Sequence, residues 1–151
     1  MYTNFLNRLK KFFLSTLGNK ANFLTKVKDS ERISRFLVPD HFKKLNMEVK
    51  AAAFLPPKDL QMSVYQTTTL DDPAVWHIGK KFVEAKRKDG KSIEARADLF
   101  AIDIRNQSLD IVSSPTPHKL HAHIIAWSLE KSSHRLKAAE LALRAVLLIK
   151  P

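Results

Sequence analysis

The sequence predicts an α+β fold with a mainly antiparallel sheet of four to five strands. Several short stretches alternate apolar and polar residues, which is typical of half-buried strands. A single long helix pattern separates two groups of such stretches, whereas regular alternation of strands with helices would indicate a parallel sheet. A second, more apolar helix pattern closes the chain at residues 132–149. We therefore expect a mid-chain helix and a buried C-terminal helix to pack on the sheet.

The N-terminal 28 residues differ in composition from the rest of the chain. They contain no acidic residue. Their apolar side chains recur at helical spacing, at Phe5, Leu6, Leu9, Phe12, Phe13 and Leu17. This pattern predicts a basic amphipathic helix over residues 4–17 that ends at Gly18. Because 151 residues suit one hydrophobic core, we expect a basic N-terminal segment, residues 1–28, and a single α+β domain, residues 29–151.

The expected domain begins with a segment that fits a short helical turn. Residues 30–37 read SERISRFL, with Ser30 as a cap and Pro39 as a stop. In such a turn Arg32 and Arg35 would be neighbours on one helical face. The pair would suit a phosphate group, and it would suit surface ion pairs equally well.

The next segments are better marked. Residues 47–54 fit a strand or a helix, and we favour a strand. Residues 60–67 alternate apolar and polar side chains and predict a strand. A helix follows, with Thr69 as its N-cap and a proline in its first turn. It ends before the Asp89-Gly90 pair.

The second half of the chain predicts strands and then a helix. Residues 94–104 fit a long strand, and residues 106–108 a turn that would pair this strand with residues 109–112 as a hairpin. Residues 119–127 fit a further strand. Residues 132–149 fit a helix that is apolar almost all round, with a narrow polar line, so it should be largely buried.

Composition narrows the class of protein. The formal net charge of +11 and a pI near 10.0 indicate a polyanionic partner. The absence of cysteine excludes disulfides, thiol nucleophiles and thiolate zinc sites. With three glycines, the chain has no glycine-rich phosphate loop and no dinucleotide fingerprint. Apolar runs are too short to span a bilayer, and no secretory signal is recognisable, so we expect a cytoplasmic protein.

Basic residues gather in three places along the sequence. We take them as candidate nucleic-acid contacts: Arg8, Lys10, Lys11, Arg32, Arg35, Lys80, Lys81, Lys86, Arg87 and Lys88. Lysines and arginines near the C-terminus of a helix are also favoured by the helix dipole, so residues 80–91 do not need a ligand to explain them. The exposed aromatic residues that single-strand binders use are few here, with Tyr65, Trp76 and Trp127 as the candidates.

Three histidines near the penultimate strand are the candidate catalytic residues. His121 and His123 should share one face of a strand, and His118 lies in the loop that precedes it. One histidine can act as a general base and another as an acid. A cation must then hold the developing charge, with these candidates: Arg32, Arg35, Arg96 and Lys119.

Two other interpretations of the histidines remain open. A metal site would need a carboxylate from Asp98, Asp103 or Asp110. The histidines can also lie on the less apolar face of the sheet without any chemistry. We predict no bound metal or cofactor.

Three functional hypotheses follow, and the sequence leaves open whether the protein is an enzyme. The first is a small basic protein that binds nucleic acid through its backbone, or an acidic protein partner. The second is a histidine-based nuclease, of the kind found among toxins, centred on His121 and His123. The third is a protein held at a membrane surface by residues 1–17. The oligomeric state and the identity of the partner do not follow from the sequence.

Overall fold

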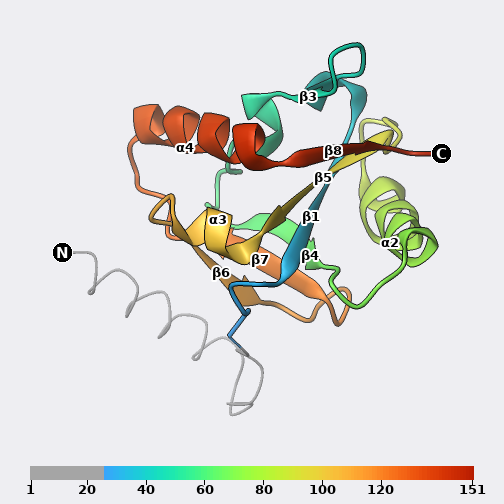
Figure 1. Cartoon of the computed structure of the whole chain (residues 1–151), viewed down its shortest axis with the longest axis horizontal. Coiled ribbons are helices and arrows are strands. Elements are labelled where there is room, and N and C mark those ends of the chain that lie inside the picture. The colour runs from blue at the N-terminus through green and yellow to red at the C-terminus, as the bar shows by residue number, and fades with distance from the viewer. Residues whose placement is uncertain (1–25) are drawn as a thin grey trace.

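The computed structural model describes residues 26–151, so the helix predicted at residues 4–17 lies outside the described range. Strands and short helices follow one another irregularly along this range (Figure 1). Its strands are β1 (Arg32–Leu37), β2 (Phe42–Lys43), β3 (Glu48–Val49), β4 (Met62–Gln66), β5 (Ala95–Phe100), β6 (Asp110–Ser113), β7 (His121–Ile125) and β8 (Val146–Ile149). Its helices are α2 (Asp72–Ile78), α3 (Ala101–Arg105) and α4 (Lys131–Arg144), with 3-10 or π turns at Pro39–His41, Ala51–Phe54, Gly79–Val83 and Glu84–Lys86.

Six strands form one sheet in the order β6-β7-β4-β1-β5-β8, and neighbouring strands are antiparallel. The short strands β2 and β3 pair separately. The predicted α+β class with a mainly antiparallel sheet is thus confirmed. The sheet exceeds the four to five strands we expected, because β1 and β8 come from segments for which we predicted helix.

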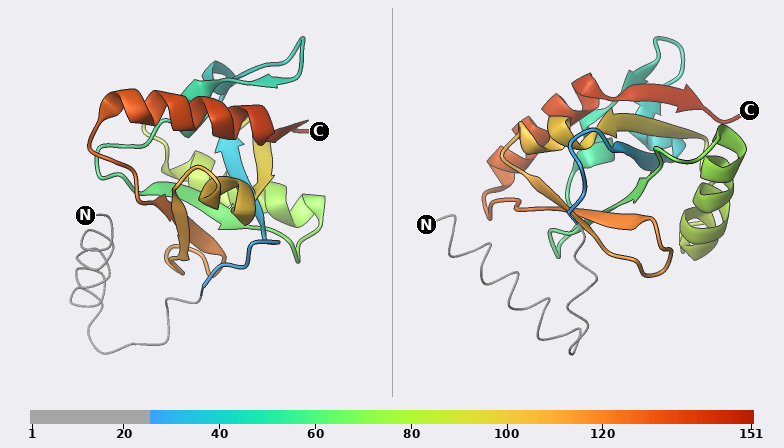
Figure 2. Two further views of the ribbon diagram at one scale, coloured as in Figure 1. Left: turned by 60° about the vertical axis from the view of Figure 1, so that its left-hand side comes forward. Right: turned by 60° about the horizontal axis from the view of Figure 1, so that its bottom comes forward.

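The two faces of the sheet carry different helices (Figure 2). Alternate residues of a strand point to opposite faces. On one face Ile33 belongs to the larger apolar core, together with Ala138 and Leu141 of α4. On the other face Phe36 belongs to a smaller core with Val75 of α2. We call these the α4 face and the α2 face.

The prediction of a helical turn at residues 30–37 is wrong, because this segment is the central strand β1. Ile33 and Leu37 have helical spacing, but they also lie on one face of a strand. β1 pairs with β5 along its whole length and with β4 on its other side. These two ladders supply hydrogen-bond partners for the backbone N–H and C=O groups of β1. No local sequence signal predicts that this strand is buried. Arg32 and Arg35 therefore lie on opposite faces of the sheet rather than side by side.

The predicted hairpin between residues 94–104 and 109–112 does not form. β5 ends at Phe100, and α3 begins directly after it, with the Asp103 carboxylate accepting a hydrogen bond from the Phe100 backbone N–H at 3.0 Å. The turn at residues 106–108 joins α3 to β6. β6 pairs with β7, and β5 lies between β1 and β8. The side chain of Asp103 favours a helix start that strand periodicity alone does not reveal.

The C-terminal helix is shorter and more exposed than predicted. α4 ends at Arg144, and Val146–Ile149 form β8, which pairs with β5. Leu136 and Leu143 are 72% and 80% exposed, so the helix buries one face rather than nearly all of its surface. A run of Val, Leu, Leu and Ile suits a strand once a neighbouring strand is present to pair with it.

The remaining predictions fit the structure more closely. Residues 60–67 contain β4 and residues 119–127 contain β7. The mid-chain helix starts at α2 and continues through π and 3-10 turns to Lys86, but its N-cap is Asp71 rather than Thr69. The ambiguous segment 47–54 divides into β3 and a 3-10 turn. Within residues 26–151 no helix is long and apolar enough to cross a membrane.

Candidate functional site

Polar side chains gather on the α2 face of the sheet, where the strand register aligns them. Ser34 of β1 lies opposite Asp98 of β5 on one side and Tyr65 of β4 on the other. Tyr65 in turn lies opposite His121 of β7. Two groups result. We call the first the arginine network, formed by Arg32, Ser34, Thr67, Asp72, Arg96 and Asp98. We call the second the imidazole cluster, formed by Tyr65, Phe82, His118, His121 and His123.

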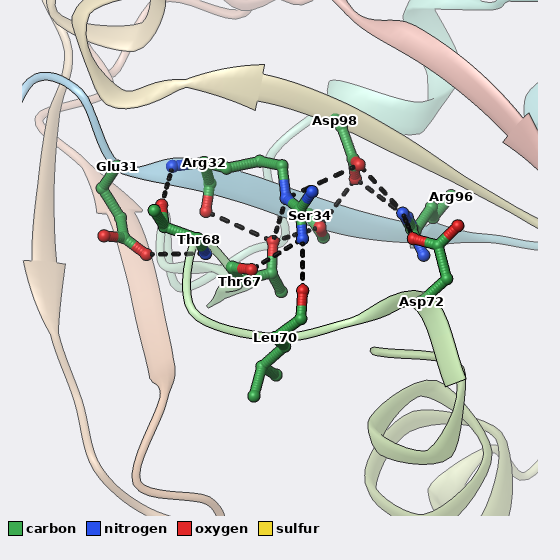
Figure 3. Close-up of polar contacts among 9 residues, drawn as sticks. All are labelled: Glu31, Arg32, Ser34, Thr67, Thr68, Leu70, Asp72, Arg96 and Asp98. Carbon is green, nitrogen blue, oxygen red and sulfur yellow. Dashed lines mark hydrogen bonds and ion pairs between the residues drawn. The ribbon is translucent and has the colours of Figure 1, made fainter. Parts of the chain in front are cut away.

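The centre of the arginine network is the buried Asp98 carboxylate (Figure 3). It accepts a hydrogen bond from the Ser34 hydroxyl at 2.6 Å and from Arg96 Nε at 3.2 Å. Arg96 is 1% exposed, and its Nη2 donates to Asp72 at 2.7 Å. Its guanidinium also lies 4.9 Å from the Trp76 ring centroid. Arg96 thus fastens the start of α2 to the sheet.

The guanidinium groups of Arg32 and Arg35 donate hydrogen bonds to backbone carbonyls of the protein. Arg32 Nη2 donates to the backbone carbonyls of Thr67, at 2.7 Å, and Leu70, at 3.1 Å. Arg35 donates to the carbonyls of Ala53, at 3.2 Å, and Ser63, at 2.9 Å. Burial lowers the pKa of Arg35 to about 10, so its guanidinium stays charged at neutral pH. Both arginines have structural partners already, which leaves few donors for a ligand.

The structure brings the three candidate histidines together. The rings of His121 and His123 are 4.7 Å apart between centroids and nearly perpendicular. The Tyr65 ring lies 5.2 Å from that of His121 and 6.2 Å from that of His118. Phe82, from the π turn after α2, lies 4.9 Å from His118. Sequence alternation predicted the His121–His123 pair, but the contacts with Tyr65 and Phe82 depend on strand order.

Strand alternation would place Trp127 on the same face as His121 and His123, but the structure places it on the other face. Ala126 has a φ of 69°, a left-handed conformation that breaks the alternation after β7. The indole therefore turns to the α4 face, where Trp127 is 1% exposed and belongs to the larger core. Trp127 is a core residue rather than a stacking platform.

Burial lowers the pKa of all three imidazoles, which disfavours their charged form. Burial, with a smaller contribution from the neighbouring His121, lowers the pKa of His123 to about 4. It also lowers the pKa of His121, against a hydrogen bond to Ser114 that acts in the opposite direction. For His118, burial again has the largest effect, followed by the charge of Lys119 and the effects of His121 and Lys81. Neutral imidazoles can accept protons, but they are poor general acids.

The carboxylates that a metal site would need lie elsewhere. Asp98 is held in the arginine network, Asp103 caps α3, and Asp110 accepts a hydrogen bond from Arg105 at 3.1 Å. Within the described residues, no group of three or more His, Asp or Glu side chains is arranged to hold a metal ion.

Exposed lysines occur in the turns that follow α2 and in the loop that precedes β7. Lys80, Lys81, Lys86 and Lys88 are exposed, and none of them takes part in an ion pair among residues 26–151. Lys119 is exposed on the loop between β6 and β7. We call these five residues the lysine surface. Arg87 differs, since it donates from Nε to Asp89 at 2.9 Å. Arg8, Lys10 and Lys11 lie outside the described residues.

The fold brings the turn after α2 close to the loop before β7, although the two segments are far apart in the sequence. Lys119 directly follows His118 in the chain, and Phe82, whose ring lies 4.9 Å from that of His118, directly follows Lys81. The Lys81 ammonium is 5.5 Å from the Phe82 ring centroid. Phe82 packs against the smaller core, and sequence reasoning did not reveal its contact with His118. Only the proximity of the turn after α2 to the loop before β7 reveals it.

Comparison of the chain with protein-family models, with curated proteins and with solved structures gives no match. A functional assignment must therefore rest on the chemistry of these two clusters and of the lysine surface.

Proposed function

We propose that the protein binds the phosphate backbone of nucleic acid through the lysine surface, with the imidazole cluster at its edge. The observation that carries this proposal is the set of exposed lysines that have no acidic partner within residues 26–151. Most arginines of the same range donate to carbonyls or carboxylates of the protein. The lysines of this surface are therefore among the cations of the described range that remain available to phosphate.

Aromatic rings beside the lysines favour nucleic acid over an acidic protein. Phe82 and His118 are partly exposed and lie next to Lys81. Proteins that bind single strands combine cations along the backbone with rings on which bases stack. The net charge of +11 adds long-range attraction for any polyanion. We therefore expect binding that depends on charge and has little sequence preference.

The test measures the affinity for a labelled single-stranded oligonucleotide across a range of salt concentrations. The site variant carries Lys80→Gln, Lys81→Gln and Lys86→Gln. The control carries Lys44→Gln, Lys131→Gln and Lys137→Gln, which removes the same charge from other elements. Each phosphate contact on a single strand contributes about 0.7 to the slope of log K against log salt. The site variant should reduce this slope by about 2, while the control keeps it.

Three outcomes would contradict the proposal. Affinity that does not change with salt would exclude backbone binding. An equal loss in the site variant and in the control would mean that total charge, rather than this surface, determines binding. Salt-dependent capture of an acidic protein with no retention of RNA or DNA would favour the other class of partner.

A nuclease centred on His121 and His123 is the second candidate, and the short distance between their rings favours it. The lowered pKa values of both histidines weigh against it, since a two-histidine mechanism needs one charged imidazole. In the binding assay, RNA and DNA should also be scored for cleavage with and without a chelator. Cleavage that persists in both His121→Ala and His123→Ala would remove this candidate.

A further inference from the structure

We propose that the imidazole cluster selects ribonucleotides, with His118 donating from Nε2 to a phosphate oxygen and His121 accepting at Nε2 from the adjacent 2′-hydroxyl. This inference rests on the proposed binding of nucleic acid and names RNA as its preferred form. It gives His118 the role of hydrogen-bond donor and His121 that of acceptor, whereas the sequence offered both only as candidate catalytic residues.

Backbone hydrogen bonds fix opposite tautomers on the two rings. His118 Nδ1 accepts a hydrogen bond from the Leu120 backbone N–H at 3.1 Å. In a neutral ring the proton must then be on Nε2, which becomes a donor. His121 Nδ1 lies 2.8 Å from the Ser114 carbonyl, which can only accept, so Nδ1 carries the proton. His121 Nε2 is therefore an acceptor.

The loop between β6 and β7 holds both rings in place. The Ser114 backbone N–H donates to the His121 carbonyl at 2.9 Å, and the His121 N–H donates to the His118 carbonyl at 2.9 Å. Both imidazoles lie against the ring of Tyr65. The two rings thus border Tyr65 on a hydrogen-bonded loop, and this arrangement exists before any ligand binds.

The side-chain nitrogen atoms that lack a hydrogen-bond partner are consistent with this assignment of donor and acceptor. Three buried side-chain atoms lack a hydrogen-bond partner within the described range: His41 Nδ1, Arg96 Nη1 and His123 Nδ1. His121 Nε2 makes no hydrogen bond within the described range, and it is not one of these three buried atoms. Because His121 as a whole is only 4% exposed, a small donor group suits this position better than a base edge.

The charges near the cluster favour a phosphate on the His118 side. Lys119 is adjacent to His118 in the chain, and the Lys81 ammonium lies 5.5 Å from the Phe82 ring that contacts His118. Asp59 is the carboxylate that acts on His123, at the other end of the cluster. In RNA the 2′-hydroxyl is next to the 3′-phosphate on the same ribose, and this hydroxyl is the donor that distinguishes RNA from DNA. A ribonucleotide therefore supplies both groups in the order that the two imidazoles require.

The experiment compares single-stranded RNA, DNA and 2′-O-methyl RNA of one sequence at one salt concentration, with RNA integrity checked on a gel. A neutral hydrogen bond predicts that RNA binds about 2- to 10-fold more tightly than the other two. His121→Phe should remove this preference, so that RNA, DNA and 2′-O-methyl RNA bind the variant with similar affinities. His77→Phe, at an exposed histidine of α2, is the control and should retain the preference.

The outcomes separate this inference from the proposed function. Equal, salt-sensitive affinity for RNA and DNA would overturn the ribonucleotide site and leave backbone binding intact. Binding of 2′-O-methyl RNA as tight as RNA would also overturn it, without any change to the protein. An RNA preference that survives in His121→Phe would exclude His121 as the acceptor. Failure to bind any of the three strands would refute the proposed function itself.

Discussion

The arginine network and the imidazole cluster lie on the same face of one sheet, yet they are organised in opposite ways. In the network, Asp98 accepts hydrogen bonds from Ser34 and Arg96, and Arg96 also pairs with Asp72. In the cluster, side chains meet mainly through ring contacts, and the nearby lysines have no acidic partner in the described chain. The first group resembles a closed structural unit, and the second leaves groups free for a ligand.

The difference follows from what each side chain can do when it is buried. A buried guanidinium keeps its charge, so it needs carboxylates and carbonyls around it. An imidazole can lose its charge instead, and burial lowers the pKa values of His118, His121 and His123. Paired charges indicate a structural role, and neutral imidazoles beside unpaired lysines indicate a binding role. Four measurements test this contrast between the arginine network and the imidazole cluster.

The largest effect is expected from Arg96→Met. This change removes the guanidinium whose Nε lies 3.2 Å from the buried Asp98 carboxylate and leaves it the more distant Arg32, at 4.0 Å, which should lower the free energy of unfolding by about 3–5 kcal/mol. Urea denaturation measures the change. Arg144→Met, in the exposed pair with Glu140, is the control and should cost only about 0.3–0.5 kcal/mol. Equal losses in the two variants would show that the network is not a structural centre.

A matched pair of serines compares the two regions directly. Ser34→Ala removes the hydroxyl that donates to Asp98 at 2.6 Å, so we expect a loss of about 1.5–3 kcal/mol. Ser63 lies opposite His123 on the neighbouring strand pair, and it is exposed. Ser63→Ala should change the free energy of unfolding by less than about 0.5 kcal/mol. Similar losses at the two positions would contradict the proposed division.

The imidazole cluster should make stability depend on pH between 7 and 5. The pKa of His123 is about 4 in the folded protein, below its ordinary value of 6.5, so the unfolded state binds a proton first as the pH falls. Stability is therefore full above pH 6.5 and falls towards pH 4, by roughly 2 kcal/mol between pH 7 and pH 5. His123→Gln should flatten this dependence in denaturation series. Parallel curves for the two proteins would refute the shifted pKa.

The smallest effect concerns the contact that holds α2 over both regions. A Cβ added at Gly79 would lie 2.6 Å from Cε1 of Phe36, whose ring is buried against Tyr65 and Trp76. Overpacking costs about 1–3 kcal/mol, and the higher helix propensity of alanine returns up to about 1 kcal/mol. We expect Gly79→Ala to destabilise the protein by about 1–2 kcal/mol in thermal or urea unfolding. A neutral or stabilising result would show that α2 is loosely packed.

Sequence reasoning succeeded where a segment's own pattern was decisive. The alternation at residues 60–67 identified β4, and a proline with nearby aspartates marked the start of α2. The same reasoning placed His121 and His123 on one face of β7, and their rings are in contact. It failed for β1, whose residues suit a helix equally well, and for Trp127, which a single left-handed residue redirects.

By itself the sequence determined the α+β class, the basic charge and the residue types on each side of β4 and β7, because these depend on composition and on local periodicity. Only the tertiary structure decided that residues 32–37 and 146–149 are strands, since their hydrogen bonds go to partners distant in the chain. The same long-range pairing encloses Arg32 and Arg96 among carboxylates and carbonyls, and it brings Lys81 and Phe82 to His118. Which charges are paired and which remain available is therefore a property of the folded sheet, because a side chain's partners are set by strand order.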